Sequence, residues 1–491
     1  MNGLRVNDVH EFLPSAREKD VPTVTTDVPR GIAMNRWILV AALALAGVMF
    51  VAPAPTAAQD KKEEPQLTAV QKSNVAVLDA LIRNVRQNFY DKKYGGLDLN
   101  KLREKYLKQV VDSASGAPLH KVLNQLIAEF KVSHFGVMEG DVYNVNFVPE
   151  MNNTFSVRPG FDIGRIHGEY FVANVYQDSA AEHGGLLRGD RLVLVNGQPI
   201  EESPLLVDAG SDPGIPGEPH FFLRVPDDLT ELTLGVQRKR GDEKLTAVTL
   251  KPTAINMIYA TKKSVSVIEY KGRKFGYIRF WHFLHDGMTT ALRNAIKKDW
   301  KDCDGAIIDL RGRGGSPLVM NACFAPFGTP PSMGRMFGGG GNYNMPRWEK
   351  PVIALQDAGS RSAKEIYAHN WKYLNIGPIV GETTPGCVLG SSFVELPDGS
   401  QMIMPMQDAA VYCYGNVRLE ANGVAPTHAV KDLLAYSEGV DTIKEAGIKV
   451  IYDLVLESKP AAPEAAPEKK PADDKDEEEK FFVTARHESR G

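Results

Sequence analysis

The chain has 491 residues, with 43% apolar and 24% charged side chains, which is ordinary for a globular protein. One hydrophobic core rarely accommodates so many residues, so we expect two to four domains. The formal net charge of −4 gives no reason to expect a nucleic-acid partner, because proteins that bind nucleic acids usually present a basic surface.

Cysteine usage bears on metal sites and on the compartment. The four cysteines form no CxxC pair, so neither a zinc site nor a redox-active dithiol is indicated. We expect no metal and no other cofactor. A single disulfide between Cys387 and Cys413 is an alternative if the protein enters an oxidising compartment.

The N-terminal part of the chain carries the pattern of an export signal. Residues 1–33 are polar, fit no signal and are interpreted as an extension that is not native. Residues 34–58 combine a basic start at Arg36, an apolar run over 38–51 and small residues up to Ala58, as signal peptides do. The run is shorter than the roughly 20 residues of a membrane span, but an uncleaved anchor is the alternative. We expect an exported protein in the periplasm or another extracytoplasmic location.

Residues 67–150 are predicted to form an N-terminal helical cap domain. Gly95 and Gly96 separate its first helix from its second. Ser133 and His134 come just after its last helix. The apolar residues with helical spacing are Val75, Leu78, Leu81, Ile82, Val85, Leu102, Tyr106, Val110, Leu119, Val122, Leu123, Leu126 and Ile127.

Residues 155–252 are predicted to form a β-rich domain. Its short motifs resemble those of a PDZ domain; they are Ser-Ala-Ala…Gly-Leu, Gly-Asp and Val-Asn-Gly. Residues 201–226, rich in proline and glycine, are expected to be a loop insertion. The expected elements are a strand over 171–175, a short helix over 179–186, a strand within 189–197 and a hairpin over 232–250.

Residues 262–456 have the alternation of an α/β core. The strand expected over 305–310 is buried, since every residue between Gly305 and Asp309 is apolar. Residues 458–491 are expected to be a disordered tail, because they offer too little apolar surface to bury. The other expected strands cover 275–280, 351–355, 379–380, 402–406 and 409–412, and the expected helices cover 288–300, 362–374 and 441–456.

Ser362 opens one of these helices and is a candidate nucleophile. A helix N-terminus offers unpaired N–H groups and a partial positive charge where an oxyanion would form, and the N–H of Ala363 would be one donor. Taken alone, the serine is more simply explained as an N-cap, since Glu365 would complete a capping box with it.

Residues 309–316 end the buried strand with a glycine-rich turn. Glycines let a backbone approach a substrate, and Gly314 is the candidate for a second oxyanion donor. The spacing fits neither a dinucleotide-binding GxGxxG motif nor a P-loop. A tight turn without a ligand is the alternative.

His134 and Glu420 are candidates for the base and the carboxylate that acyl transfer to a serine requires. A lone histidine is more often a satisfied residue at a domain edge. His282 and His285 would fall on opposite faces of a strand, so they do not indicate a metal site.

The order of helical cap, PDZ-like domain and α/β core with DLRGxGG, SxSAxE and GETT motifs resembles the C-terminal processing and tricorn-type serine peptidases. The resemblance covers about residues 67–456 and implies an α/β fold class with a ClpP/crotonase-like core. In the branch that pairs its serine with a lysine, the lysine lies in a GxTxGKG motif. Here Cys387 stands at that place, and Lys364 would point about 200° from Ser362 around the helix.

The tricorn-type branch is the closer match. It combines a Ser–His pair in the N-terminal part, a nucleophilic serine and a late glutamate before Gly-Val-x-Pro, which correspond to Ser133, His134, Ser362 and Glu420. The resemblance implies that Ser362 attacks a peptide carbonyl and that His134 is its base. Glu420 would orient Ser133 beside the histidine.

The PDZ resemblance implies recognition or gating of protein C-termini. An extended peptide would add to a sheet edge, with its carboxylate in the loop of Gly160, Phe161, Asp162 and Ile163. In the alternative, the domain only forms a lid over the peptidase.

Two other classes of function stay open. A catalytically inactive, peptidase-like protein would bind peptides or other ligands, and Val132, Arg361, Lys364 and Cys387 depart from the family pattern. Acyl-CoA chemistry on a crotonase-like core is a third class, but no pantetheine or adenine site is evident. The expected partner is a polypeptide substrate, with membrane anchoring through residues 34–58 as an option. The sequence does not predict the oligomeric state.

Overall fold

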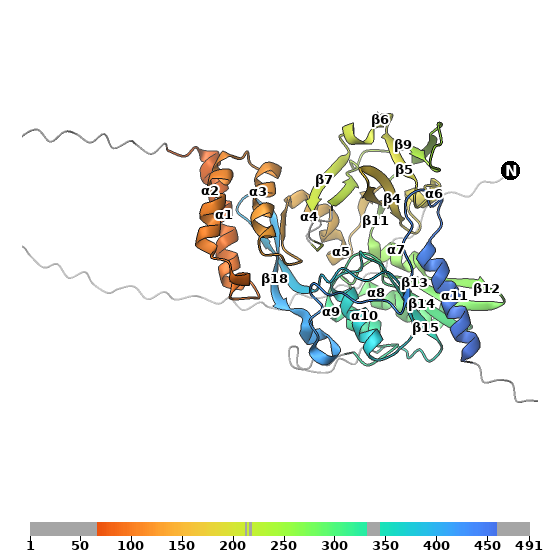
Figure 1. Ribbon diagram of the computed structural model, residues 1–491. Helices are drawn as coiled ribbons and strands as arrows, with labels where there is room; N and C mark the ends of the chain where they lie inside the picture. Colours follow the sequence, from red (N-terminus) through yellow and green to blue (C-terminus); the bar gives the residue numbers. More distant parts are fainter. Residues whose placement is uncertain (1–65, 212–213, 216–218, 331–343, 459–491) are drawn as a thin grey trace, which may run out of the picture. The chain divides into compact units, whose positions relative to one another are not determined.

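The computed structural model describes residues 66–211, 214–215, 219–330 and 344–458 (Figure 1). The predictions for residues 1–33, for residues 34–58 and for the tail beyond residue 458 lie outside this part of the chain. Within the described part, no helix combines the length and the apolar character needed to cross a bilayer.

The predicted helical cap is confirmed as helices α1 (Ala69–Asn88), α2 (Leu99–Asp112) and α3 (Ala117–Ala128). Their side chains form one apolar cluster with Met402 and Met404, which lie almost three hundred positions later. The helices therefore pack on a late strand of the chain. This contact brings the segment after α3 to the core.

A three-stranded antiparallel sheet carries that contact. Strand β1 (Gly136–Met138) pairs with β18 (Gln401–Asp408), which pairs with β17 (Leu389–Glu395), and Val137 lies opposite Met402. Helices α4 (Gly140–Asn146) and α5 (Val148–Asn152) follow β1. Because His134 is two residues before β1, the register of this sheet sets where it lies.

The PDZ-like domain is an antiparallel sheet with its own apolar cluster. A short two-stranded sheet of β2 (Ser156–Arg158) and β11 (Thr253–Ile255) joins the chain where it enters and leaves the domain. The predicted strands and the helix α6 (Ala180–His183) are present. The other elements are β3 (Phe161–Ile166), β4 (Glu169–Val175), β5 (Arg191–Val195), β6 (Gln198–Pro199), β9 (Leu232–Gln237) and β10 (Thr246–Leu250), with a 3₁₀ turn at Ile200–Glu202.

The insertion over residues 201–226 is not the loop that we expected. It contains β7 (Leu206–Ser211) and β8 (Pro219–Leu223), and β8 pairs with β3 with Phe221 opposite Ile163. Phe221 and Leu223 are buried in the domain's apolar cluster. Burial of these side chains favours a strand despite the surrounding prolines and glycines.

The α/β core is built on a six-stranded sheet. Strands β13, β14, β15, β16 and β19 are parallel, and β12 is antiparallel to β13. In chain order they are β12 (Ser266–Tyr270), β13 (Arg273–Arg279), β14 (Gly305–Asp309), β15 (Val352–Gln356), β16 (Ile379–Gly381) and β19 (His428–Ala429).

Helices cover both faces of this sheet, as the fully apolar strands predict. Ile308 of β14 belongs to one apolar cluster with α7 (Met257–Ser264), α8 (Gly287–Asn294), α9 (Pro317–Phe324) and α10 (Ala363–Tyr373). Its neighbour Ile307 packs in a second cluster with α11 (Thr442–Glu457). The loops that follow β14, β15 and β16 leave the same edge of the sheet, because these strands are parallel.

Two local predictions in the core are wrong. Residues Ala409–Tyr412 form a 3₁₀ helix instead of a strand, because the Asp408 side chain accepts from the N–H of Ala410 and caps the turn. The helix expected over 288–300 is α-helical only to Asn294 and continues as a π-helical turn over Ala295–Asp299.

Candidate active site

Ser362 lies between β15 and α10, at the edge where the parallel strands end. Its backbone has φ 60° and ψ −127°, a strained conformation for a residue with a side chain. Its side chain makes no capping hydrogen bond, so the capping-box interpretation is wrong. The strain and the absence of a capping hydrogen bond favour a nucleophile over an N-cap.

Two backbone N–H groups beside Ser362 are available to an oxyanion. In the described part of the chain, neither the N–H of Ala363 nor that of Gly314 donates to a protein acceptor. A Cβ on Gly314 would lie 2.7 Å from Cβ of Ser362, so the glycine turn reaches the serine side chain. Glycine is required at this approach.

Ser133, His134 and Glu420 form one hydrogen-bonded chain. Ser133 Oγ lies 2.9 Å from His134 Nδ1 and donates over 2.9 Å to Glu420 Oε2. The Ser133 N–H donates over 2.8 Å to the other oxygen, Glu420 Oε1. Ser133 and His134 are buried.

These contacts fix which nitrogen of His134 carries a proton. The Ser133 hydroxyl has one proton, which it donates in the hydrogen bond to the Glu420 carboxylate. The same oxygen must then accept from Nδ1–H of His134. In the neutral imidazole the proton is therefore on Nδ1 and the lone pair is on Nε2, which is the form that a general base needs.

One loop joins this chain of hydrogen bonds to the serine. The N–H of Ser362 donates over 2.8 Å to the Cys387 carbonyl. The N–H of the next residue, Val388, donates over 2.7 Å to Glu420 Oε2. Two consecutive loop residues thus hold the nucleophile's backbone and the carboxylate, and the four predicted residues belong to one network.

Glu365 anchors this loop and was missed as a site residue. Its carboxylate accepts from the Thr384 hydroxyl over 2.6 Å and from the N–H groups of Gly386 and Cys387 over 2.8 and 2.7 Å. Burial raises the pKa of Glu365 to about 7, although these hydrogen bonds act to lower it, and the charge of Glu420 adds to the rise. The only sequence signal was the SxSAxE motif, which we interpreted as a possible cap.

The comparisons with known proteins match three segments of the chain. Residues 274–430, which contain the serine, the glycine turn and the glutamate, match the model of peptidase family S41. Residues 75–128 match the tricorn protease C1 domain, and residues 171–206 match a PDZ domain. The core of this chain therefore resembles peptidase family S41.

Curated relatives of the chain carry peptidase names. It is 24% identical to a putative tricorn protease homolog 2 of Streptomyces coelicolor, over 79% of this chain and 33% of the relative. It is 26% identical to the carboxy-terminal processing protease CtpB of Bacillus subtilis, over 58% of each chain. The chain thus spans between a third and three fifths of the length of these relatives.

Solved structures that match the chain include a processing protease and mature CPAF. The photosystem II D1 C-terminal processing protease matches with a TM-score of 0.46 and 18% identity, over 73% of this chain and 93% of its own. Mature CPAF matches with a TM-score of 0.48 and 14% identity, over 80% of this chain and 99% of its own.

Lys364 of the core binds groups on the side away from the serine hydroxyl, as its place on the helix predicts. Its buried ammonium donates to the carbonyls of Phe280 and Gly312 over 2.6 Å each and to Arg311 over 3.1 Å. Burial, together with the charge of Arg279, holds the pKa of Lys364 well below its usual value. The lysine ties α10 to the glycine turn.

The histidines and cysteines of the core also have defined surroundings. His282 Nε2 lies 3.0 Å from the buried Glu150 carboxylate, and its Nδ1 accepts from Leu284 N. His285 Nδ1 accepts from Gly287 N. No disulfide joins Cys387 to Cys413 or to either other cysteine, and all four lie in the described part.

The predicted carboxylate loop lies where the PDZ-like domain meets the core. Strand β3 has β4 on one side and β8 on the other, so a peptide strand could add to β3 only if β8 moved away. Phe161 and Ile163 are buried, and Ser179 Oγ donates to the Gly160 carbonyl. Asp162 forms an ion pair with Arg313 of the glycine turn. Peptide binding by this loop stays a prediction.

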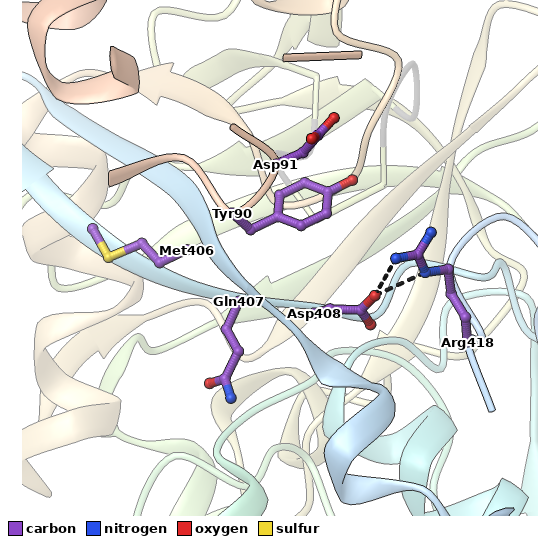
Figure 2. Close-up of a pocket in the computed structure, with 6 residues that line it drawn as sticks. All are labelled: Tyr90, Asp91, Met406, Gln407, Asp408 and Arg418. Carbon is purple, nitrogen blue, oxygen red and sulfur yellow. Dashed lines mark hydrogen bonds and ion pairs between the residues drawn. The ribbon is translucent and has the colours of Figure 1, made fainter. Parts of the chain in front are cut away.

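A cavity of about 510 Å³ adjoins the site. Figure 2 shows its lining residues, with Asp408 and Arg418 joined by hydrogen bonds. Burial and then the charge of Glu420 raise the pKa of Tyr90, so the cavity is within electrostatic reach of Glu420. The lining residues are Tyr90, Asp91, Met406, Gln407, Asp408 and Arg418.

Proposed function

We propose that this chain is a serine endopeptidase of the tricorn-type branch that cleaves polypeptides through an acyl-enzyme. The observation that carries the proposal is the hydrogen-bonded chain from Glu420 through Ser133 to His134, fixed by the loop that also holds Ser362. A binding protein without catalysis has no need for a histidine held in the tautomer of a base.

The proposed reaction starts with attack of Ser362 Oγ on the peptide carbonyl. His134 Nε2 takes the hydroxyl proton and then gives it to the leaving amine, which breaks the peptide bond and leaves an ester on Ser362. A water molecule, activated by the same histidine, hydrolyses the ester. The Ala363 and Gly314 N–H groups hold the oxyanion in both steps, and removing one such donor typically costs about 10²–10³ in kcat.

The cellular setting is part of the same proposal. The apolar run over residues 38–51, flanked by Arg36 and by small residues, supports export to an extracytoplasmic compartment, with the signal cleaved or kept as an anchor. The names of two relatives, a tricorn protease homolog and a carboxy-terminal processing protease, support a polypeptide substrate.

Labelling with a fluorophosphonate tests the nucleophile. We expect the full chain to be labelled and to hydrolyse an unfolded protein substrate, and Ser362→Ala to lose both without a change in melting temperature. His120→Gln is a matched control for His134→Gln, because His120 is also buried and pairs with a carboxylate, Asp398, outside the site. Full activity of Ser362→Ala would mean that another residue is the nucleophile. A folded wild type that is neither labelled nor active would favour the inactive binding protein.

A further inference from the structure

The PDZ-like domain contacts the glycine turn, which carries the oxyanion donor Gly314, through an ion pair. Arg313 Nη2 donates over 2.7 Å to Asp162 Oδ1, and Nη1 donates over 3.2 Å to Oδ2. Asp162 lies on β3 of the PDZ-like domain, while Arg313 is the residue before Gly314 in the core. A two-point contact of this kind fixes the direction of both side chains.

Asp162 is itself held firmly within its domain. Asn174 Nδ2 donates to Asp162 Oδ2 over 3.0 Å, and the Tyr176 hydroxyl donates to Oδ1. Burial acts to raise the pKa of Asp162, but the charge and hydrogen bonds of Arg313 outweigh it and the pKa is lowered. The carboxylate is therefore charged at neutral pH and offers Arg313 a rigid anchor.

The side chain of Arg313, which is 30% exposed, has further contacts. Its guanidinium also donates over 3.0 Å to the Tyr176 hydroxyl and lies 5.4 Å from the ring centroid of Trp281. Cation–π contacts at this distance add to the ion pair. The Arg313 side chain is thus fixed by groups of both domains.

The backbone of Arg313 decides where the Gly314 N–H points. Arg313 has φ 50°, a left-handed conformation that is unfavourable for a non-glycine residue. Its carbonyl accepts from the N–H of Arg361, next to the nucleophile, over 3.1 Å. The Gly314 N–H belongs to the peptide unit that follows the Arg313 Cα, so relaxation of Arg313 to negative φ would turn that N–H away from Ser362.

We infer that Asp162 is a positioning residue: through Arg313 it holds the glycine turn so that the Gly314 N–H faces the oxyanion. The inference rests on the proposed function and assigns the PDZ-like domain a part in the rate of the chemical step. Loss of the pair then lowers kcat and leaves KM nearly unchanged, since the ground-state substrate gains little from the oxyanion donor.

The chain offers a matched control for the test. Arg188 and Asp432 form a second ion pair between the PDZ-like domain and the core segment before α11, in which Nη2 alone donates to both carboxylate oxygens over 2.7 and 2.6 Å. Asp432 and Asp162 are similarly exposed, at 24% and 23% of their side chains. Of these two pairs, only that of Asp162 includes a residue of the glycine turn, Arg313.

The experiment compares Asp162→Asn, Arg313→Gln, the double variant and Asp432→Asn in the full chain, with steady-state kinetics on a fluorogenic peptide. We expect kcat to fall about tenfold or more in the first two variants, with no further fall in the double variant, and KM to change less than about twofold. Asp432→Asn should keep kcat within about twofold. Binding of a peptide boronate should weaken in parallel with kcat, while binding of the product peptide stays unchanged.

The outcomes separate this inference from the proposed function. If the wild type hydrolyses peptides and Asp162→Asn has the kcat of Asp432→Asn, or changes only KM, the inference is overturned and the proposed function stands. A folded wild type with no Ser362-dependent hydrolysis overturns both. If Asp162→Asn does not fold, Arg313→Lys, which keeps the charge but loses the two-point contact, must show the fall in kcat.

Discussion

Ser133 and Glu420 lie 287 positions apart, yet the Ser133 hydroxyl donates a hydrogen bond of 2.9 Å to the Glu420 carboxylate. Ser133 comes from the helical cap, and Glu420 follows the last long strand of the core. The site therefore exists only when the cap is docked. Pairing of β1 with β18 provides that docking.

Replacing Ser133 by alanine should lower kcat without removing the nucleophile. Nδ1–H of His134 then loses its acceptor, and the histidine no longer has a fixed tautomer or ring orientation. We expect kcat to fall roughly 10²–10⁴-fold, which is comparable to the loss in serine proteases whose catalytic histidine is held in the wrong tautomer. In Ser133→Ala, the pH at which kcat falls on the acid side should differ from that of the wild type. Ser362→Ala should have no measurable kcat at any pH. An unchanged pH profile in Ser133→Ala would contradict this role of the serine.

Gly314→Ala should abolish activity through a direct clash. Its Cβ would meet Cβ of Ser362 at 2.7 Å and the Arg361 carbonyl at 3.0 Å. The matched control is Gly359→Ala in the neighbouring turn, whose Cβ would find no atom nearer than 3.4 Å. We expect a fall of at least about 10²-fold in kcat for the first variant and less than about threefold for the second, with circular dichroism to confirm folding.

Glu365 should make stability fall as pH rises from about 4.5 to 7. Its pKa is about 7 in the folded protein against an ordinary 4.5, so the folded state binds more protons than the unfolded state within this window. The stabilising effect is complete below pH 4.5 and is lost as pH passes 7, on the order of 3 kcal/mol in total. Urea denaturation of wild type and Glu365→Gln between pH 4.5 and 8 measures it.

A control for this pH dependence is another buried glutamate, Glu150. Burial acts to raise the pKa of Glu150, but His282 and Arg158 outweigh it and the pKa is lowered. Its contribution is therefore present above its ordinary pKa and lost as pH falls. Glu150→Gln should not remove the fall in stability between pH 4.5 and 7. A fall that persists in Glu365→Gln would mean that another group titrates there.

The cavity beside Glu420 should favour cationic substrate side chains. Two carboxylates, Asp91 and Asp408, face one guanidinium, that of Arg418, and the N–H groups of Gly95 and Lys93 hold the pKa of Asp91 below its usual value. We expect Asp91→Asn to lower kcat/KM for peptides with lysine or arginine about two- to fivefold and to leave leucine peptides unchanged. Arg418→Gln should act in the opposite direction. Equal effects on both peptide classes would exclude the cavity as a side-chain subsite.

Local patterns in the sequence determined most elements and the chemical types at the site. The buried strand over 305–309 and the helix after Ser362 follow from runs of apolar residues and from a helix start, which depend on neighbours in the chain. The types and order of the four site residues could be matched without knowing where they lie. The hairpin of β7 and β8 was missed because its prolines and glycines conceal a pairing with β3 that is decided by burial.

Tertiary structure alone decided how these residues are connected. Glu365 looked like a helix cap, but the loop of residues 384–388 returns over α10 and offers its carboxylate better donors. Asp162 looked like part of a peptide-binding loop, but docking of the PDZ-like domain places Arg313 against it. Hydrogen bonds between distant segments depend on strand register and domain docking, and neither is encoded in the spacing of residues along the chain.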